Sequence, residues 1–225
     1  MKEYIHILKR SGMFSSATED EIESMLGCLA ATTSHYDKNE FIIRSGEPIH
    51  SVGMVLQGSV LIVKEDFWGN RTIISEITAG SVFAEAYACL SKLPLETSVI
   101  ANENCVVMFF DVKKILSVCS NACSHHTRLI QNLLSTLAEK NITLTRKIEH
   151  ISKKTIRDKL LSYLSSESLK NNNASFSIPY NRQQLAEYLS VDRSALSNEI
   201  SKLQSEGILT CHKNEFTMMT DYDSF

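Results

Sequence analysis

The sequence NRQQLAEYLSVDRSALS, at residues 181–197, decides the fold of the C-terminal part of this chain. Asn181 with Gln184 three residues later has the spacing of a capping box, which begins a helix. A short turn follows, and Asp192 is the expected N-cap of a second helix that Gly207 ends. Two helices joined by so short a turn predict a helix-turn-helix.

The two helices have an apolar face and a polar face. The expected inward positions are apolar: Leu185, Ala186, Leu189, Val191, Leu196, Ile200 and Leu203. The outward positions near the start of the second helix are polar: Arg193, Ser194, Ser197, Asn198 and Ser201. That end of a recognition helix reaches base edges in the major groove, where arginine pairs with guanine and asparagine with adenine. The small serines would let the backbone approach phosphates, and Arg182, Gln183, Lys202 and Lys213 are further candidate DNA contacts.

The segments around the two helices fit the same interpretation. Residues 208–218 are typical of strand, turn and strand, and so predict a wing. Before the helix-turn-helix, a helix is expected from Lys153 to about Ser166, with a loop over 170–175. A plain helical hairpin with a solvated polar face is the simpler alternative, but it leaves the wing unexplained.

A long helix precedes this region. Apolar residues and one asparagine recur at alternating steps of four and three: Ile130, Leu134, Leu137, Asn141, Leu144, Ile148 and Ile151. This spacing is a heptad seam, in which a single buried asparagine favours one register and one oligomeric state. We expect a homodimer through this helix. The alternative is that the stripe packs on the rest of its own chain, and both can be partly true.

The N-terminal half changes from helical to strand-like spacing. Residues 1 to about 30 predict one or two short helices, with Thr18 as an N-cap. Short apolar runs then occur at 41–43, 52–56, 60–63, 72–74 and 106–110, with Gly46, Gly58, Gly69 and Gly80 between them. Glycine at such corners supplies positive φ. Many short strands separated in this way predict a small barrel or sandwich.

Composition limits the partners and the compartment. The chain has 225 residues and a formal net charge of −3, so DNA contact requires a local basic surface. Basic residues gather around the domain junction: Lys140, Arg146, Lys147, Lys153, Lys154, Arg157 and Lys159. They are either a solvated face or a flank for phosphates. No segment is long and apolar enough to span a membrane, no secretion signal is evident, and scattered cysteines predict thiols, so we expect a cytoplasmic protein.

Three stretches together resemble the superfamily of the cyclic-AMP receptor protein and the fumarate-nitrate reduction regulator. The first is the strand-rich region with its motifs 44–48 (RSGEP), 55–60 (VLQGSV) and 79–85 (AGSVFAE), the second is the seam helix, and the third is 181–197. The resemblance implies an α+β fold with a β-roll of the cyclic-nucleotide-binding type, related to the cupin double-stranded β-helix. A dimerisation helix and a C-terminal winged helix-turn-helix would follow. The expected domains are 1–118, 119–151 and 152–225.

The resemblance also assigns roles to single residues. Arg193 matches the guanine-reading arginine, whereas Ser194 and Asn198 match base-reading positions that vary in the family. Glu85 matches the glutamate that holds ribose, but Ala84 replaces the usual glycine. The phosphate-binding arginine expected near Thr97 and Ser98 is absent, and neighbouring Glu96 would repel a phosphate.

The expected sensing pocket is therefore not one for cyclic AMP. Its candidate lining is Ile74, Ser75, Ala84, Glu85, Ala86, Thr97 and Ser98, and the effector is an unidentified small molecule or redox signal. An iron-sulfur cluster is not expected, because Cys28 is the only early cysteine. Cys119 and Cys123, followed by His125 and His126, could bind metal or respond to oxidation, but incidental cysteines are the simpler interpretation and no metal site is predicted.

The sequence as a whole predicts a homodimeric transcriptional regulator that binds near-palindromic double-stranded DNA. RNA polymerase is a further candidate partner. An effector is expected to shift the long helix, and a rotation at the junction near Ser152 would change the separation of the two reading helices. An enzyme is not expected, because cupin enzymes need a histidine-rich metal site that these strands lack. The competing hypothesis is a regulatory or scaffolding subunit whose winged domain binds protein.

Overall fold

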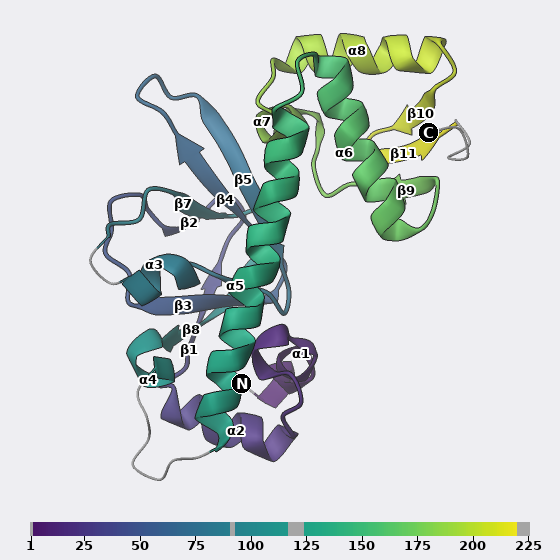
Figure 1. The fold of residues 1–225 in the computed structure, drawn as a ribbon. Helices are drawn as coiled ribbons and strands as arrows, with labels where there is room; N and C mark the ends of the chain where they lie inside the picture. Colours follow the sequence, from purple (N-terminus) through teal and green to yellow (C-terminus); the bar gives the residue numbers. More distant parts are fainter. Residues whose placement is uncertain (1, 91–92, 117–123, 220–225) are drawn as a thin grey trace. The chain divides into compact units, whose positions relative to one another are not determined.

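The computed structural model describes residues 2–90, 93–116 and 124–219 (Figure 1). The chain divides into two compact units, residues 1–141 and 142–225, and each is described here by itself. The division falls within the long helix α5 (Ser124–Ile151), whereas the sequence predicts a boundary at its end, after residue 151. Among the described helices, none has the length and apolar content needed to cross a membrane.

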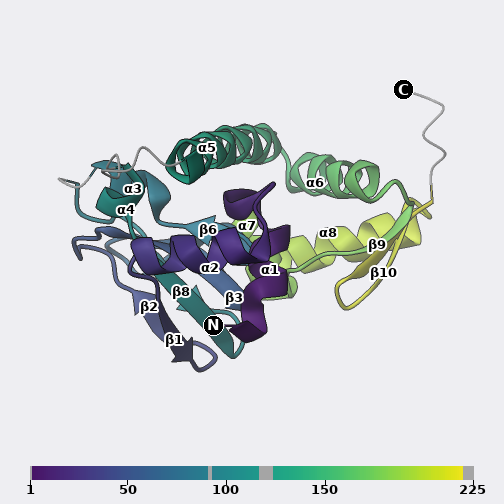
Figure 2. The same cartoon turned by 90° about the horizontal axis from the view of Figure 1, so that it is seen from below.

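The first unit begins with short helices that cover one sheet. They are η1 (Lys2–Tyr4), α1 (Ile5–Arg10), η2 (Gly12–Phe14) and α2 (Glu19–Cys28). Thr18 caps α2 as predicted, and Glu21 completes a capping box by accepting a hydrogen bond from the Thr18 N–H at 2.8 Å. Figure 2 shows α1 and α2 beside β3 and β8.

Two antiparallel sheets form the β-roll, in the strand orders β1-β8-β3-β6 and β2-β7-β4-β5. The strands are β1 (Thr32–Tyr36), β2 (Phe41–Ile43), β3 (Ser51–Gln57), β4 (Ser59–Glu65), β5 (Arg71–Thr78), β6 (Val82–Phe83), β7 (Ser98–Ala101) and β8 (Cys105–Asp111). The predicted runs correspond to β2, β3, β4, β5 and β8, and the sequence analysis missed β1, β6 and β7. The short helices α3 (Glu85–Leu90) and α4 (Val112–Leu116) follow β6 and β8.

Alternation along β3 and β8 divides the apolar residues between two cores. Met54 and Met108 pack with the N-terminal helices and with Leu129 and Leu133 of α5. Val55, on the opposite face, packs with the second sheet. One sheet is therefore buried on both faces, because successive strand residues point to opposite sides.

Two glycines in this unit are required by close contacts. A Cβ on Gly53 would lie 2.3 Å from the ring of Phe83, so only glycine fits this point of β3. Gly58 has a φ of +77°, and a Cβ there would lie 2.6 Å from the carbonyl oxygen of Asn104. Gly58 thus allows the tight turn between β3 and β4 predicted from the sequence.

The second unit contains the end of α5 and a winged helical domain. Its other elements are α6 (Ile156–Asn171), β9 (Ser175–Ser177), α7 (Arg182–Leu189), α8 (Arg193–Ser205), β10 (Leu209–His212) and β11 (Glu215–Met218). The wing strands form a sheet in the order β10-β11-β9. This confirms the predicted strand-turn-strand. The short extended piece that the sequence predicts at 176–179 corresponds to β9, whose Phe176 lies opposite Phe216.

The prediction for the helix before the wing was wrong at its C-terminal end. The predicted helix ends near Ser166 and is followed by a loop over 170–175, but α6 continues to Asn171. Asn172 ends it in the left-handed conformation, with a φ of 48°. Asparagine tolerates this conformation, so the polar run holds a helix terminus as well as a loop.

Candidate nucleic-acid interface and effector site

Side-chain caps fix the two helices of the helix-turn-helix. The side chain of Asn181 accepts a hydrogen bond from the N–H of Gln184 at 3.0 Å, and the Gln184 side chain accepts the reciprocal bond. Asp192 accepts from the N–H of Ala195 at 2.8 Å and so begins α8. Ser190, with a φ of 53°, ends α7 in the left-handed conformation and makes the turn short. The structure therefore confirms the predicted helix-turn-helix.

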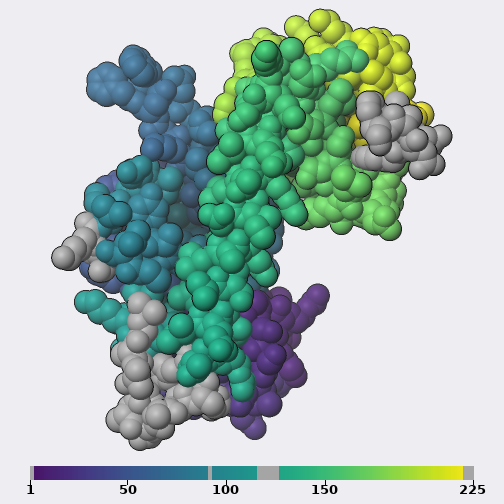
Figure 3. All heavy atoms as spheres, viewed as in Figure 1, coloured from purple at the N-terminus to yellow at the C-terminus, as the bar shows by residue number. Residues whose placement is uncertain are grey.

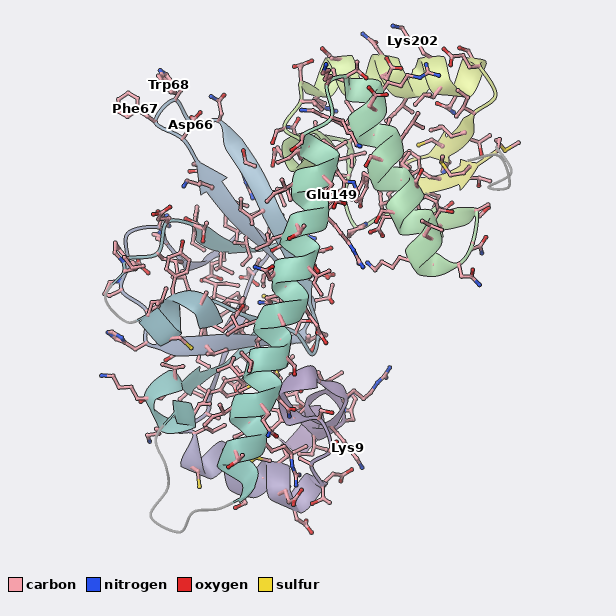
Figure 4. The ribbon with its side chains drawn as sticks, viewed as in Figure 1. Lys9, Asp66, Phe67, Trp68, Glu149 and Lys202 are labelled. Atoms are coloured by element: carbon pink, nitrogen blue, oxygen red, sulfur yellow. The ribbon has the colours of Figure 1, made fainter. Side chains whose placement is uncertain are left out.

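The recognition helix α8 presents the predicted polar face. Leu196, Ile200 and Leu203 are buried, as expected for the inward side. Arg193 and Asn198 are exposed, and so are three further predicted contacts: Ser194, Ser201 and Lys202. The Lys202 side chain projects outward from α8 (Figure 4). The first turns of α8 thus offer a guanidinium and a carboxamide to an approaching ligand.

The serines of α8 already donate hydrogen bonds within the helix. Ser194 Oγ donates to Asp192 Oδ1, and this bond is the main reason that the pKa of Asp192 is lowered. Ser197 Oγ donates to the carbonyl oxygen of Arg193 at 2.9 Å, and Ser201 Oγ donates to that of Ser197 at 3.1 Å. A serine would have to rotate before donating to DNA, so Arg193 and Asn198 are the better candidate donors.

The remaining predicted contacts lie outside α8. Arg182 is half-buried: its Nη2 lies 3.2 Å from Cys211 Sγ, and its guanidinium lies over the ring of Phe216. Gln183 is exposed and donates to Glu187 Oε1 at 2.9 Å. Lys213 is exposed in the turn between β10 and β11, with a φ of 54°. Arg182 thus connects α7 to the wing, and Lys213 is placed at the wing's tip.

An ion-pair cluster that the sequence analysis missed holds α8 against α6. Arg157 of α6 donates from Nη1 to Glu206 Oε1 at 3.1 Å and to Glu199 Oε1 at 3.5 Å. Its Nη2 also bonds Glu206 Oε2, so the pairing with Glu206 is bidentate. The hydrogen bonds raise the pKa of Arg157 and lower that of Glu206. A planar guanidinium that meets two carboxylates restrains the orientation of the recognition helix.

This pairing reduces the basic surface expected at the domain junction. Arg157 is balanced by Glu206, Lys140 pairs with Glu85, and Lys147 is buried. These three cations are therefore not available as a solvated basic face. The other described residues of that group remain accessible: Arg146, Lys153 and Lys154 are exposed, and Lys159 is half-buried.

The predicted dimer seam lies largely on an exposed side of α5. Leu134 is 67% exposed and Ile148 is 59% exposed. Ile130, Asn141 and Leu144 are also exposed, whereas Leu137 is half-buried against the core of the first unit and Ile151 is half-buried. Leu129 and Leu133, on a neighbouring face, pack on that core. The alternative that the stripe packs on its own chain holds for Leu137, and Figure 3 shows the viewed face of α5 uncovered.

The candidate effector site contains an ion pair within the first unit. Glu85 begins α3 and is 5% exposed, and its Oε1 accepts a hydrogen bond from Lys140 Nζ of α5 at 2.8 Å. The same ammonium donates to the carbonyl oxygen of Val82 at 2.6 Å. Glu85 Oε2 is buried and has no hydrogen-bond partner within the described residues. Ala84, just before Glu85, has a φ of 62°, a conformation that glycine adopts without strain.

The other predicted pocket residues are uncharged and differ in exposure. Ile74, Ser75 and Thr97 are half-buried, and Ala86 is exposed. Ser98 Oγ accepts a hydrogen bond from the backbone N–H of Ser45 at 3.0 Å.

The charges beside this stretch are already balanced. Lys64 Nζ lies 3.1 Å from Glu96 Oε2, and both side chains are more than half exposed. The residues at the position of the family's phosphate arginine thus carry no charge, and the adjacent cation is paired. This arrangement does not fit the phosphate of a cyclic nucleotide.

The cysteine and histidine candidates cannot be placed. Cys119 and Cys123 lie outside the described residues, and the side chains of His125 and His126 are not described either. The described cysteines are thiols: Cys105 is buried, Cys28 is exposed, and Cys89 and Cys211 are half-buried. Burial is the main cause of the raised pKa of Cys105, about 11, so this thiol resists ionisation.

Solved structures share this fold at low sequence identity. FixK2 from Bradyrhizobium japonicum is 20% identical, with a TM-score of 0.65 over 84% of this chain and 93% of that one. The regulator CLP from Xanthomonas campestris is 17% identical, with a TM-score of 0.73 over 89% and 98%. A CooA mutant from Carboxydothermus hydrogenoformans is 14% identical, with a TM-score of 0.71 over 92% and 88%. No curated protein sequence matches the chain.

Sequence families match both parts of the chain. The family described as "Cyclic nucleotide-binding domain" matches residues 33–122. The family described as "Crp-like helix-turn-helix domain" matches residues 158–223. Members of the family that combines these domains are transcriptional regulators rather than enzymes. The fold, the helix-turn-helix and the two matches together place this chain in the Crp/Fnr family of transcriptional regulators.

Proposed function

We propose that the protein is a homodimer that reads a near-palindromic operator with the N-terminal end of α8. The observation that carries this proposal is the exposed face of a capped, ion-paired helix, on which Arg193 and Asn198 are the candidate donors to bases. Arginine pairs with guanine and asparagine with adenine in the major groove. Lys213, at the tip of the wing, would contact phosphate. Such a regulator acts where the bacterial chromosome lies, in the cytoplasm.

The homodimer is supported by the exposed apolar stripe on α5. Ile130, Leu134, Leu144 and Ile148 recur at heptad spacing and are between 38% and 67% exposed in the single chain. A second copy of the same helix would bury these side chains and place Asn141 opposite Asn141 of the partner. A polar residue in such a seam favours a single register, and a two-fold axis then gives two half-sites about one helical turn apart.

The effector is proposed to be something other than cyclic AMP. Glu85, the candidate ribose-binding carboxylate, is bonded to the chain's own Lys140, and Thr97 stands where a phosphate-binding cation would be needed. Binding of cyclic AMP would therefore have to break an internal ion pair without gaining a charge partner for the phosphate. The neighbour CLP is described as responsive to c-di-GMP, which is also a phosphate anion, and the same argument applies to it.

Calorimetry tests whether the protein binds cyclic nucleotides. Titration of the full-length protein with cyclic AMP and with cyclic di-GMP should give a Kd above about 1 mM for each. A micromolar Kd for either nucleotide would show that Lys140 is displaced and that the site accepts a phosphate. Loss of that binding in Glu85→Gln would then assign it to this site.

The test of DNA reading is selection of duplexes from a random library by the full-length protein. We expect enrichment of a symmetric site, and Arg193→Ala should lose about 1–3 kcal/mol of binding free energy on it, with relaxed preference at one base pair per half-site. Lys202→Ala, a change on the same helix farther from its start, is the matched control and should preserve every base preference. If Arg193→Ala weakens binding equally on all sequences, Arg193 does not read a base. Failure to enrich any duplex would favour a winged domain that binds protein.

A further inference from the structure

Lys147, near the end of α5, is a charged residue in the interior of the second unit. The residue is 6% exposed, and its ammonium nitrogen lies 4.5 Å from the centroid of the Tyr188 ring in α7. A desolvated ammonium over an aromatic face is attracted by the negative face of the ring quadrupole. This contact joins the long helix to the first helix of the helix-turn-helix.

The Tyr188 ring belongs to a cluster of aromatic side chains from three parts of the unit. It stacks on Tyr180, which precedes α7, with 4.8 Å between centroids, and lies 5.2 Å from the ring of Tyr163 in α6. His150 of α5 meets Tyr163 edge-on at 6.0 Å, and its Nδ1 lies 2.8 Å from Ser162 Oγ. Lys147 and His150 thus attach the last turns of α5 to both α6 and α7.

Burying a charged lysine at this position costs free energy. Burial lowers the pKa of Lys147 to about 8, which means that the surroundings disfavour the ammonium relative to water. Tyr188 does not supply a counter-charge, because burial and then Glu167 of α6 raise its pKa to about 12. Burial also lowers the pKa of His150, and Glu149, Lys153 and Arg146 act on it from the same stretch of chain. A methionine would fill the same space at a lower cost, so packing alone does not account for the lysine.

We propose that Lys147 is a positioning residue for DNA reading: its ammonium, held over Tyr188, sets the angle between the dimerisation helix and the helix-turn-helix. The inference rests on the proposed function. Ile148, the next residue of α5, is 59% exposed and belongs to the predicted dimer seam. Tyr188 lies on α7, which is in contact with the recognition helix α8. One contact therefore connects the dimer axis to the element that reads DNA.

This arrangement gives Lys147 an effect on operator spacing rather than on base preference. In a two-fold dimer, the distance between two recognition helices follows from the angle at which each helix-turn-helix leaves the shared helix. Loss of the ammonium leaves the contacts within α8 unchanged and relaxes that angle. Half-site sequence and half-site separation are thus controlled by different residues, Arg193 and Lys147.

The experiment compares three variants of the full-length protein on a library of operators. The library keeps the half-sites that the wild-type protein selects and varies the spacer between them. Lys147→Met removes the charge with little change in volume, Tyr188→Leu removes the ring, and Tyr188→Phe keeps the ring. Circular dichroism and molar mass in solution establish that each variant is folded and dimeric.

We expect Lys147→Met and Tyr188→Leu to accept spacers that the wild-type protein rejects. On the best spacer they should bind about tenfold more weakly, with the base preference within each half-site unchanged. Tyr188→Phe should behave like the wild-type protein, because a phenylalanine face also attracts a cation. Wild-type spacing and affinity in Lys147→Met would overturn the inference while leaving the proposed function intact.

A measurement without DNA distinguishes this contact from general packing. In protein with ¹³C-labelled lysines, the Lys147 Cε protons should show an upfield ring-current shift that Tyr188→Phe keeps and Tyr188→Leu removes. No such shift in the wild-type protein would contradict the proposed contact. If the wild-type protein selects no duplex at all, the proposed function fails first, and the positioning role fails with it.

Discussion

Two lysines of α5, Lys140 and Lys147, contact the two units through different kinds of interaction. Lys140 and Lys147 lie about two turns apart along α5, each within a different unit. Lys140 donates hydrogen bonds to a carboxylate and to a carbonyl oxygen of the first unit, and its side chain is 29% exposed. Lys147 is 6% exposed and lies over an aromatic ring of the second unit. The Lys140 contact is an attraction between opposite charges. At Lys147, the surroundings disfavour the charged form of the side chain.

The largest expected effect comes from the Lys140 contact. Lys140→Met removes the partner of Glu85 and leaves a buried carboxylate, so the free energy of unfolding should fall by about 2–4 kcal/mol. Urea denaturation followed by circular dichroism measures the change. Double substitution with Glu85→Gln should recover part of the loss, because the unpartnered charge is then removed.

Lys9→Met is the matched control for this prediction. Lys9 pairs with Glu19 at 3.3 Å, but their side chains are 54% and 57% exposed (Figure 4). An exposed pair contributes at most about 1 kcal/mol, so this variant should stay near the wild-type stability. Equal losses in the two variants would mean that burial of Glu85 does not matter.

The Lys147 contact should appear as a pH dependence of stability. Its folded-state pKa is about 8, whereas an unfolded lysine titrates near 10.5. Between these values the unfolded chain binds more protons, so stability should rise with pH across this interval, by about 2 kcal/mol. Urea denaturation at several pH values from 7.5 to about 10.5 should show the rise in the wild-type protein.

The difference between the wild-type protein and Lys147→Met isolates this effect. The other ionisable groups are the same in both proteins, so their contribution to the pH dependence cancels in the difference. The variant should therefore lack only the lysine contribution, and its stability should exceed that of the wild-type protein at pH 7.5. Parallel pH curves for the two proteins would show that Lys147 is not desolvated.

The smallest expected effect concerns the residue before Glu85. Ala84 has a φ of 62°, so Ala84→Gly should relieve backbone strain and raise the free energy of unfolding by about 0.5–1 kcal/mol. Ala86→Gly, at an exposed position of α3 two residues later, should have the opposite sign, because glycine within a helix is less favourable than alanine by about 1 kcal/mol. Thermal unfolding of both variants measures the two changes. If the free energy of unfolding changes in the same direction in both variants, the backbone of Ala84 is not strained.

Local patterns predicted the elements that carry their own signals. The capping residues Asn181, Gln184 and Asp192 lie next to the helices that they begin, so the helix-turn-helix could be predicted from a short window. Heptad spacing likewise predicted α5 and the exposed stripe on it. The strands β1, β6 and β7 lack a strong apolar alternation and form by pairing with distant strands, and a window could not reveal them.

The contacts that position the site are the ones the sequence could not predict. Lys140 meets Glu85 across 55 positions of the chain, and Arg157 meets Glu206 across 49. A basic residue near the junction is compatible with a solvated face, a phosphate contact or an internal ion pair. Only the tertiary structure distinguishes these, which is why the basic stretch was interpreted as a surface.

The most direct test of the account is the stoichiometry and footprint of the full-length protein on the duplex that it selects. Two recognition helices related by a two-fold axis predict two chains per duplex. They also predict two inverted half-sites with centres about 10 base pairs apart, protected on one side of the DNA. One chain per duplex on an asymmetric site, or no selected duplex at any salt concentration, would contradict it.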